Sequence, residues 1–206
     1  MRTAVLFDYL DQKFPQSTSL IESSHMVFIQ MTGLSGSGKS TIAEAVKKLL
    51  EEKAYRVEII DGDVYRKKLC RDLAFTREDR QENIRRLGFV ANLLTTNKII
   101  TILAAINPYE AIRKELKDYG AHVKTVWVSC DLETLLKRDP KHLYRKAMLP
   151  DTHPDKIKNL TGINDPYEVP EKPDLVLHTD VESEAESAEK LYRFIIDLVG
   201  EDMEPR

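Results

Sequence analysis

The chain has 206 residues, of which 42% are hydrophobic and 32% charged, and its formal net charge is −3. These values are typical of one globular domain with a sizeable core, and without a concentrated basic block we expect no nucleic acid as partner. No apolar run is long enough to span a membrane, and charged residues interrupt the N-terminal segment where a signal peptide needs an apolar stretch, so we expect a cytoplasmic protein with no membrane partner.

The predicted elements alternate between strands and helices. Residues 1–25, with a serine and threonine cluster, are predicted to form an N-terminal extension with a candidate helix at 5–10, and the domain proper covers 26–206. The run at 98–106 is the most apolar and is predicted to be the central strand. The alternation predicts right-handed crossovers and a three-layer α/β fold with a five-stranded parallel sheet. Strands are predicted at 26–31, 56–60, 98–106, 123–129 and 174–177. Helices are predicted at 39–53, 76–97 and 182–200. One further helix is predicted with Pro108 in its first turn, and another is predicted to begin near Asp131.

A phosphate-binding motif follows the first predicted strand. Residues 33–40, GLSGSGKS, match G-x-x-x-x-G-K-[ST] in full and stand between an apolar strand and an amphipathic helix, which predicts a P-loop nucleotide-binding fold. The backbone N–H groups and the helix N-terminus are expected to face the phosphates of ATP. Lys39 is expected to be a solvated pocket charge, and the Ser40 hydroxyl to ligate Mg²⁺. The predicted ATP-binding residues of the motif are Gly33, Leu34, Ser35, Gly36, Ser37, Gly38, Lys39, Ser40 and Thr41.

Two carboxylates follow the second predicted strand. Asp61 and Asp63 stand at the edge where α/β sheets place their ligands. One is predicted to accept the proton of an acceptor hydroxyl and the other to organise Mg²⁺, with the base left open between them; Asp61 joins Ser40 as a candidate metal ligand. The chain has no guanine-reading N-K-x-D motif, because Asn97-Lys98 is followed by two isoleucines. The pattern therefore predicts a kinase and not a switch GTPase.

Several segments together resemble the adenylylsulfate kinase (APS kinase) family. The resemblance covers about residues 26–200 and keeps the motif order. It implies a P-loop kinase with a lid, transfer of phosphate from ATP to the ribose 3′-hydroxyl of adenylyl sulfate, and by analogy a homodimer. The matching segments are GLSGSGKSTIA at 33–43, DGD at 61–63, FTREDRQENIRRLG at 75–88, INPYEAIR at 106–113, RDPKHLYRKA at 138–147, TGINDPYEVP at 161–170 and the terminal helix.

The resemblance also implies roles for matching residues. Phe75 would stack on the base of the acceptor nucleotide, and Arg138 and Lys141 would belong to a lid over the phosphates, with Arg138 on ATP. Planar cationic donors also suit an anionic acceptor on chemical grounds. Without the motif context, Arg66 and Arg80 would be assigned to surface ion pairs with Glu78 or Glu82. The implied acceptor-binding residues are Arg66, Phe75, Arg80, Asn83, Ile106, Lys141 and Leu160.

Several positions depart from the family pattern, among them Val64, Asn107 and Leu160. Val64 replaces the asparagine that follows the DGD motif, and Asn107 replaces a serine that is phosphorylated in the family. Asn107 is a candidate catalytic residue that cannot carry phosphate but can form a hydrogen bond with an acceptor. Leu160 replaces a phenylalanine that covers the second face of the adenine, which predicts a relaxed base preference. Two alternatives remain open: a kinase for another nucleotide such as cytidine diphosphoramidate, used in capsule biosynthesis, and a non-catalytic nucleotide-binding protein.

Overall fold

The computed structural model describes residues 26–200, so the predicted N-terminal extension and its candidate helix lie outside the described residues. Its middle layer is a five-stranded sheet in the order β2-β3-β1-β4-β5, and every pair of neighbouring strands is parallel. The predicted fold class is confirmed. The strands are β1 (Phe28–Thr32), β2 (Val57–Asp61), β3 (Ile100–Ala104), β4 (Val123–Ser129) and β5 (Leu175–His178).

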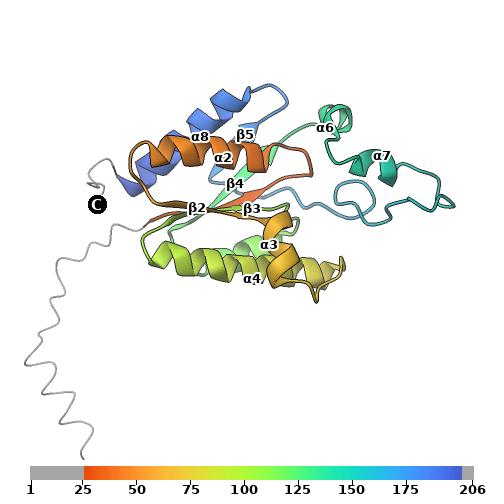
Figure 1. Ribbon diagram of the computed structural model, residues 1–206, viewed down its shortest axis with the longest axis horizontal. Coiled ribbons are helices and arrows are strands. Elements are labelled where there is room, and N and C mark those ends of the chain that lie inside the picture. Colours follow the sequence, from red (N-terminus) through yellow and green to blue (C-terminus); the bar gives the residue numbers. More distant parts are fainter. Residues whose placement is uncertain (1–25, 201–206) are drawn as a thin grey trace, which may run out of the picture.

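Helices cover both faces of the sheet (Figure 1). Side chains alternate along β1, so that Ile29 packs against α2 and α8 while Phe28 packs against α4 and α5. The two apolar clusters that result are the core of the domain. The helices are α2 (Lys39–Glu51), α3 (Gly62–Leu69), α4 (Arg77–Thr96), α5 (Glu110–Lys117), α6 (Leu132–Arg138), α7 (Leu143–Ala147) and α8 (Glu184–Val199).

The central strand is β1, so the prediction that the segment 98–106 is central is wrong. β3, which lies in that segment, is the neighbour of β1 and pairs with β2 on its other side. All residues of β1 and of β3 are buried. Hydropathy reports burial, and two inner strands that carry helices on both faces are buried alike. The apolar character of a strand therefore does not determine its place in the sheet.

Two details around the sheet also differ from the sequence-based expectations. The helix α3 was not predicted; the Asp61 carboxylate begins it by accepting hydrogen bonds from the backbone N–H groups of Asp63 and Val64. The helix α5 begins at Glu110, so Pro108 lies just before the helix and not in its first turn. Cys70 and Cys130 are free thiols. Within residues 26–200, no helix is long and apolar enough to cross a membrane.

A small lid stands beyond the P-loop at one end of the molecule, built from α6, α7 and the chain that leads to β5 (Figure 1). Its apolar cluster contains Leu135, Tyr144 and Leu160, and Leu34 of the P-loop packs against it. The Tyr144 hydroxyl donates a hydrogen bond to the Ser35 carbonyl at 2.7 Å. The lid is therefore seated on the phosphate-binding loop by both apolar packing and a buried hydrogen bond.

Candidate active site

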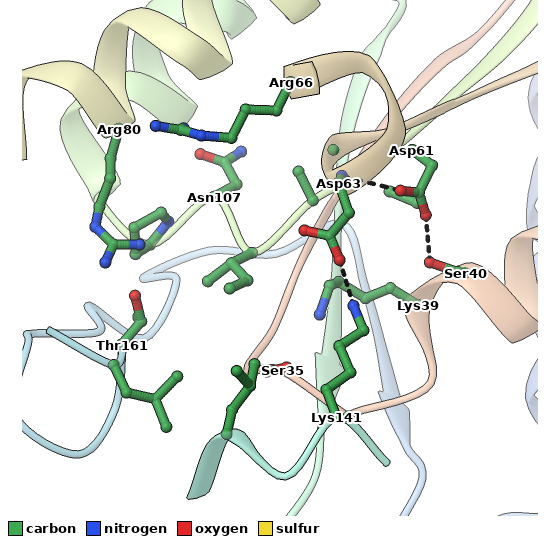
Figure 2. A pocket seen from close by; sticks show the side chains of 18 of the residues that line it. Ser35, Lys39, Ser40, Asp61, Asp63, Arg66, Arg80, Asn107, Lys141 and Thr161 are labelled. Carbon is green, nitrogen blue, oxygen red and sulfur yellow. Dashed lines mark hydrogen bonds and ion pairs between the residues drawn. The ribbon is translucent and has the colours of Figure 1, made fainter. Parts of the chain in front are cut away.

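A cavity of about 660 Å³ opens at the carboxyl ends of β1, β2 and β3 (Figure 2). The P-loop lines one part of it, the segment after β2 another and the segment after β3 a third, and the lid and the start of α4 line the rest. The cavity brings together most residues that the sequence singled out. These are Ser35, Gly36, Gly38, Lys39, Ser40, Thr41, Asp61, Asp63, Arg66, Phe75, Arg80, Asn83, Ile106, Asn107, Lys141 and Leu160.

Four predicted ATP-binding residues are not part of the cavity lining: Gly33, Leu34, Ser37 and Arg138. The Arg138 guanidinium donates a hydrogen bond to the Thr179 carbonyl at 2.5 Å. The Thr179 hydroxyl in turn donates to the Ser37 carbonyl at 2.9 Å. Arg138 is therefore linked to the P-loop through Thr179 and not through the cavity.

Lys39 is enclosed by the loop that carries it. Lys39 is only 8% exposed, and its ammonium donates hydrogen bonds to the carbonyls of Gly33 at 2.8 Å and Leu34 at 2.6 Å. Burial lowers the pKa of Lys39 to about 7, because the charged form loses its hydration. The expectation of a solvated charge is thus wrong. The P-loop curls so tightly that its own carbonyl groups take the place of water around the amine.

Ser40 and Asp61 form a pair of candidate oxygen ligands at the P-loop end of the cavity. The Ser40 hydroxyl donates to Asp61 Oδ2 at 2.6 Å, while Asp61 Oδ1 caps α3 (Figure 2). No cluster of three or more His, Cys, Asp or Glu side chains that could hold a metal occurs in the described part of the chain. Mg²⁺ usually takes one or two protein oxygens and completes its shell with water and substrate phosphates. The Ser40–Asp61 pair fits such an ion.

Asp63 meets a cation from the lid. It lies in the first turn of α3, its side chain is 69% exposed, and its carboxylate forms an ion pair with Lys141 (Figure 2). Both residues line the cavity. The pair brings a lid cation next to the carboxylate that α3 carries, and so connects the lid to the acidic end of the site.

A cationic wall lines the predicted acceptor end of the cavity. The Arg66 guanidinium lies 4.4 Å from the centroid of the Phe75 ring, and that of Arg80 lies 5.4 Å from the same centroid. Arg80 also donates to the Asn159 carbonyl at 2.6 Å and forms an ion pair with Asp165 at 3.5 Å. These arginines are therefore held toward the cavity and the lid, not in surface pairs with the acidic residues of their own segment.

Asn83, Asn107 and Leu160 are buried residues of the cavity lining. Within the part of the chain that the structure describes, the side-chain oxygens of Asn83 and Asn107 are the buried polar atoms without a hydrogen-bond partner. Leu160 is 7% exposed and packs mainly in the lid cluster. The acceptor end of the cavity thus combines two unpaired amide oxygens with an aliphatic wall.

Sequence reasoning missed several residues that shape the site. Thr161 lines the cavity and Tyr144 seats the lid, and both lie inside segments that carry the family resemblance. Gln30 is different, because it lies in the middle of β1 and contacts Asn107, which is 77 residues away. A polar residue inside an otherwise apolar strand was the one signal that could have indicated it.

Comparisons with known proteins agree with this geometry. Residues 25–178 match the family model described as adenylylsulphate kinase. A probable adenylyl-sulfate kinase of Synechocystis sp. is 46% identical over 172 residues, covering 84% of this chain and 94% of the relative. An adenylyl-sulfate kinase of Halothermothrix orenii is 47% identical over 169 residues, covering 82% and 89%.

A solved structure is also similar. The APS kinase CysC of Mycobacterium tuberculosis, in complex with AMPPNP and APS, is 37% identical and superposes with a TM-score of 0.74, covering 85% of this chain and 98% of that one. The family model matches most of the chain, and the relatives are aligned over nearly their whole length. The chain belongs to the adenylylsulphate kinase family.

Proposed function

We infer that this chain is an adenylylsulfate kinase, which transfers the γ-phosphate of ATP to the ribose 3′-hydroxyl of adenylyl sulfate. Family membership supports this activity, and one structural observation carries the assignment of roles. A single cavity is lined by most of the P-loop with Lys39 and Ser40, by two carboxylates and by a cationic wall with an aromatic ring. Phosphoryl transfer needs these parts together, because its catalysis is mainly positioning and charge stabilisation. The presence of all of them argues against a non-catalytic nucleotide-binding protein.

The P-loop end of the cavity is proposed to bind ATP. The backbone N–H groups of the loop, the N-terminus of α2 and Lys39 would surround the phosphates, and phosphate charge would favour the protonated form of Lys39. Ser40 and Asp61 would hold Mg²⁺, which neutralises phosphate charge when it is bound. Arg138 would interact with ATP from its position beside the loop. Hydrogen bonds through Thr179 link it there to Ser37.

Asp63 is the better candidate for the general base. Both oxygens of Asp61 are already used, one by the Ser40 hydroxyl and the other by the start of α3. The Asp63 carboxylate is exposed to the cavity and has only the lid residue Lys141 as an ion-pair partner in the described chain. We propose that Lys141 turns to the transferred phosphate in the ternary complex, which frees Asp63 to accept the proton of the 3′-hydroxyl.

The acceptor end of the cavity is proposed to bind the nucleotide that receives the phosphate. Arg66 and Arg80 would hold its anionic phosphosulfate group, and Phe75 and Leu160 would contact its base. Asn83 and Ile106 complete the lining at this end. The curated relatives described above are named for adenylyl sulfate, and we therefore rank cytidine diphosphoramidate below it. A homodimer remains a prediction from the family resemblance.

The test is an assay with ATP and adenylyl sulfate in which ADP and the 3′-phosphorylated product are both quantified. We expect equal amounts of the two products. Cytidine diphosphoramidate should be phosphorylated less efficiently than adenylyl sulfate. Arg80→Ala should raise the KM for adenylyl sulfate at least tenfold and leave the KM for ATP within twofold, whereas Asp63→Asn should lower kcat. ADP release without a phosphorylated nucleotide, or a better rate with the cytidine compound, would contradict the assignment.

A further inference from the structure

Gln30 is a polar residue in the centre of the sheet. It lies in β1, is 0% exposed, and its Nε2 donates hydrogen bonds to the Arg113 carbonyl at 3.0 Å and to the Thr125 hydroxyl at 3.1 Å. A primary amide has two N–H groups on one side and only acceptor capacity on the other. Because both N–H groups are used, the remaining Oε1 of Gln30 can only accept a hydrogen bond.

Asn107 supplies the matching donor. Its Nδ2 donates to Gln30 Oε1 at 3.1 Å, which places the amide nitrogen of Asn107 toward the sheet and leaves its oxygen on the other side. Asn107 lines the cavity, is 1% exposed, and its Oδ1 has no hydrogen-bond partner within residues 26–200. A buried acceptor without a partner is costly, so a donor is expected from a group that enters the cavity.

The backbone of Asn107 is held as firmly as its side chain. Its φ of +44° lies in the left-handed region, which asparagine adopts more readily than most residues. Its carbonyl accepts hydrogen bonds from the Thr32 hydroxyl at 3.0 Å and from Arg113 Nη1 at 2.8 Å. Neither the backbone nor the amide of Asn107 is therefore free to turn without breaking buried hydrogen bonds.

The strand order places Asn107 where the two substrates meet. It follows β3, which lies between β2 and β1 in the sheet. Asp61 ends β2 and Asp63 stands two residues later in α3, and the P-loop with Lys39 follows β1. An acceptor hydroxyl that reacts with the γ-phosphate must reach the region between these two groups, so the ribose is the part of the acceptor that comes closest to Asn107.

We propose that Asn107 Oδ1 accepts a hydrogen bond from the ribose 2′-hydroxyl of adenylyl sulfate, and that Gln30 is the positioning residue that keeps this oxygen directed to the ribose. The inference rests on the proposed function. The 3′-hydroxyl gives its proton to the base, so the neighbouring 2′-hydroxyl is the donor that remains on this part of the nucleotide. Its hydrogen bond orients the sugar so that the 3′-oxygen faces the γ-phosphate.

The experiment compares adenylyl sulfate with its 2′-deoxy analogue in the same coupled assay. For the wild-type enzyme we expect kcat/KM to be lower with the 2′-deoxy analogue by roughly three- to tenfold, the loss typical of one hydrogen bond, with the KM for ATP unchanged. In Asn107→Ala the ratio of the two substrates should fall to about one, because the acceptor for the 2′-hydroxyl is gone. Equal use of both substrates by the wild-type enzyme, or full discrimination in Asn107→Ala, would overturn the proposal.

Variants of Gln30 test the positioning role. Gln30→Met should lower the discrimination as Asn107→Ala does, and the double variant should show no further loss. Gln30→Glu should keep the discrimination between the two substrates, because its buried carboxyl group still offers an acceptor to Asn107 Nδ2. If the methionine variant does not fold, Gln30→Glu tests the positioning role by itself. Thr101→Val is the matched control, since Thr101 is equally buried in β3 but its hydroxyl donates only to the Ile99 carbonyl at 3.2 Å.

Two outcomes separate this inference from the proposed function. If the wild-type enzyme forms no phosphorylated product from adenylyl sulfate itself, the proposed function fails. If it phosphorylates adenylyl sulfate while Gln30→Glu loses discrimination and Thr101→Val keeps it, the kinase assignment stands and the role of Gln30 is wrong.

Discussion

Lys39 combines burial with a charge that the reaction needs. Replacement of this buried side chain by methionine keeps its approximate volume and removes the charged group that we propose to bind the phosphates. We expect Lys39→Met to lower kcat at least a hundredfold, the range for loss of one preorganised electrostatic contact. The fold should persist, because a desolvated amine with a pKa of about 7 is replaced by an apolar group.

Turnover and thermal unfolding, measured on the same preparations, test this prediction. Lys48→Met is the control, because Lys48 lies on the same helix and is exposed. Near wild-type turnover in Lys39→Met would remove the P-loop from the mechanism.

Asn107 determines whether a covalent phosphoenzyme can form at this position during the reaction. Because an amide cannot form the phosphoester that a serine can, we expect direct transfer from ATP to the acceptor in a ternary complex. Incubation with γ-labelled ATP alone, followed by denaturation, should leave the protein unlabelled. Label on a peptide that covers 101–113 would contradict this expectation. Asn107→Ser is the variant to compare with the wild-type enzyme in this labelling experiment, because it restores a hydroxyl at this position. The wild-type enzyme should be active without that hydroxyl.

We expect Leu160 to occupy the place where an aromatic residue would cover the base of the acceptor. Stacking of one base on an aromatic side chain is worth about 1–3 kcal/mol, and the leucine supplies part of that contact already. We expect Leu160→Phe to raise the preference for adenylyl sulfate over a cytidine diphosphate analogue by roughly three- to tenfold in kcat/KM. An unchanged preference would show that the residue does not contact the base. Thermal unfolding must accompany the assay, because Leu160 also packs in the lid cluster, where added volume costs about 1–3 kcal/mol.

At the scale of elements, the lid and the P-loop fit together at a glycine. Gly162 has a φ of +87°, and a Cβ placed there would lie 2.5 Å from Leu34 Cδ2. Leu34 packs against the lid cluster, so it cannot move aside without disturbing the lid. Gly200 is a matched control: its φ is +80°, but a Cβ there would meet nothing within 4 Å.

We expect Gly200→Ala to cost about 1–3 kcal/mol, the backbone strain of its positive φ with a ψ of 144° and no clash. Gly162→Ala should cost the strain of a positive φ plus about 1–3 kcal/mol for the clash, and should also raise the KM for ATP because the lid rests on the P-loop. Chemical denaturation and steady-state kinetics give the two quantities. Equal costs for both substitutions, with unchanged kinetics, would show that the lid tolerates a shift of Leu34.

At the scale of the whole molecule, we expect the chemistry to need only the domain that follows residue 25. Among the described residues 26–200, all that line the cavity fall between 35 and 161. We therefore expect a protein of residues 26–206 to keep kcat and both KM values within twofold of the full chain. A loss of activity with the fold intact would show that residues 1–25 contribute to the site. Light scattering on both proteins also tests the predicted homodimer and shows whether the N-terminal segment takes part in it.

The sequence alone determined those features that depend on neighbours along the chain. Eight consecutive residues carry the P-loop, and Asp61 and Asp63 directly follow the strand that positions them. The alternation of apolar runs with amphipathic stretches was enough to predict the strands, most helices and the parallel sheet. The missed helix α3 is short and has no buried residue, so the apolar periodicity by which helices are recognised was absent.

Only the tertiary structure decided which residues meet across the chain. The pairing of Asp63 with Lys141 spans 78 positions and that of Gln30 with Asn107 spans 77. Such contacts depend on the strand order and on how the lid packs, and no local pattern contains either. The burial of Lys39 is of the same kind, since carbonyl groups surround its amine only when the loop is curled between β1 and α2. Local order along a chain follows from its own side chains, whereas the environment of a charge follows from the packing of all the others.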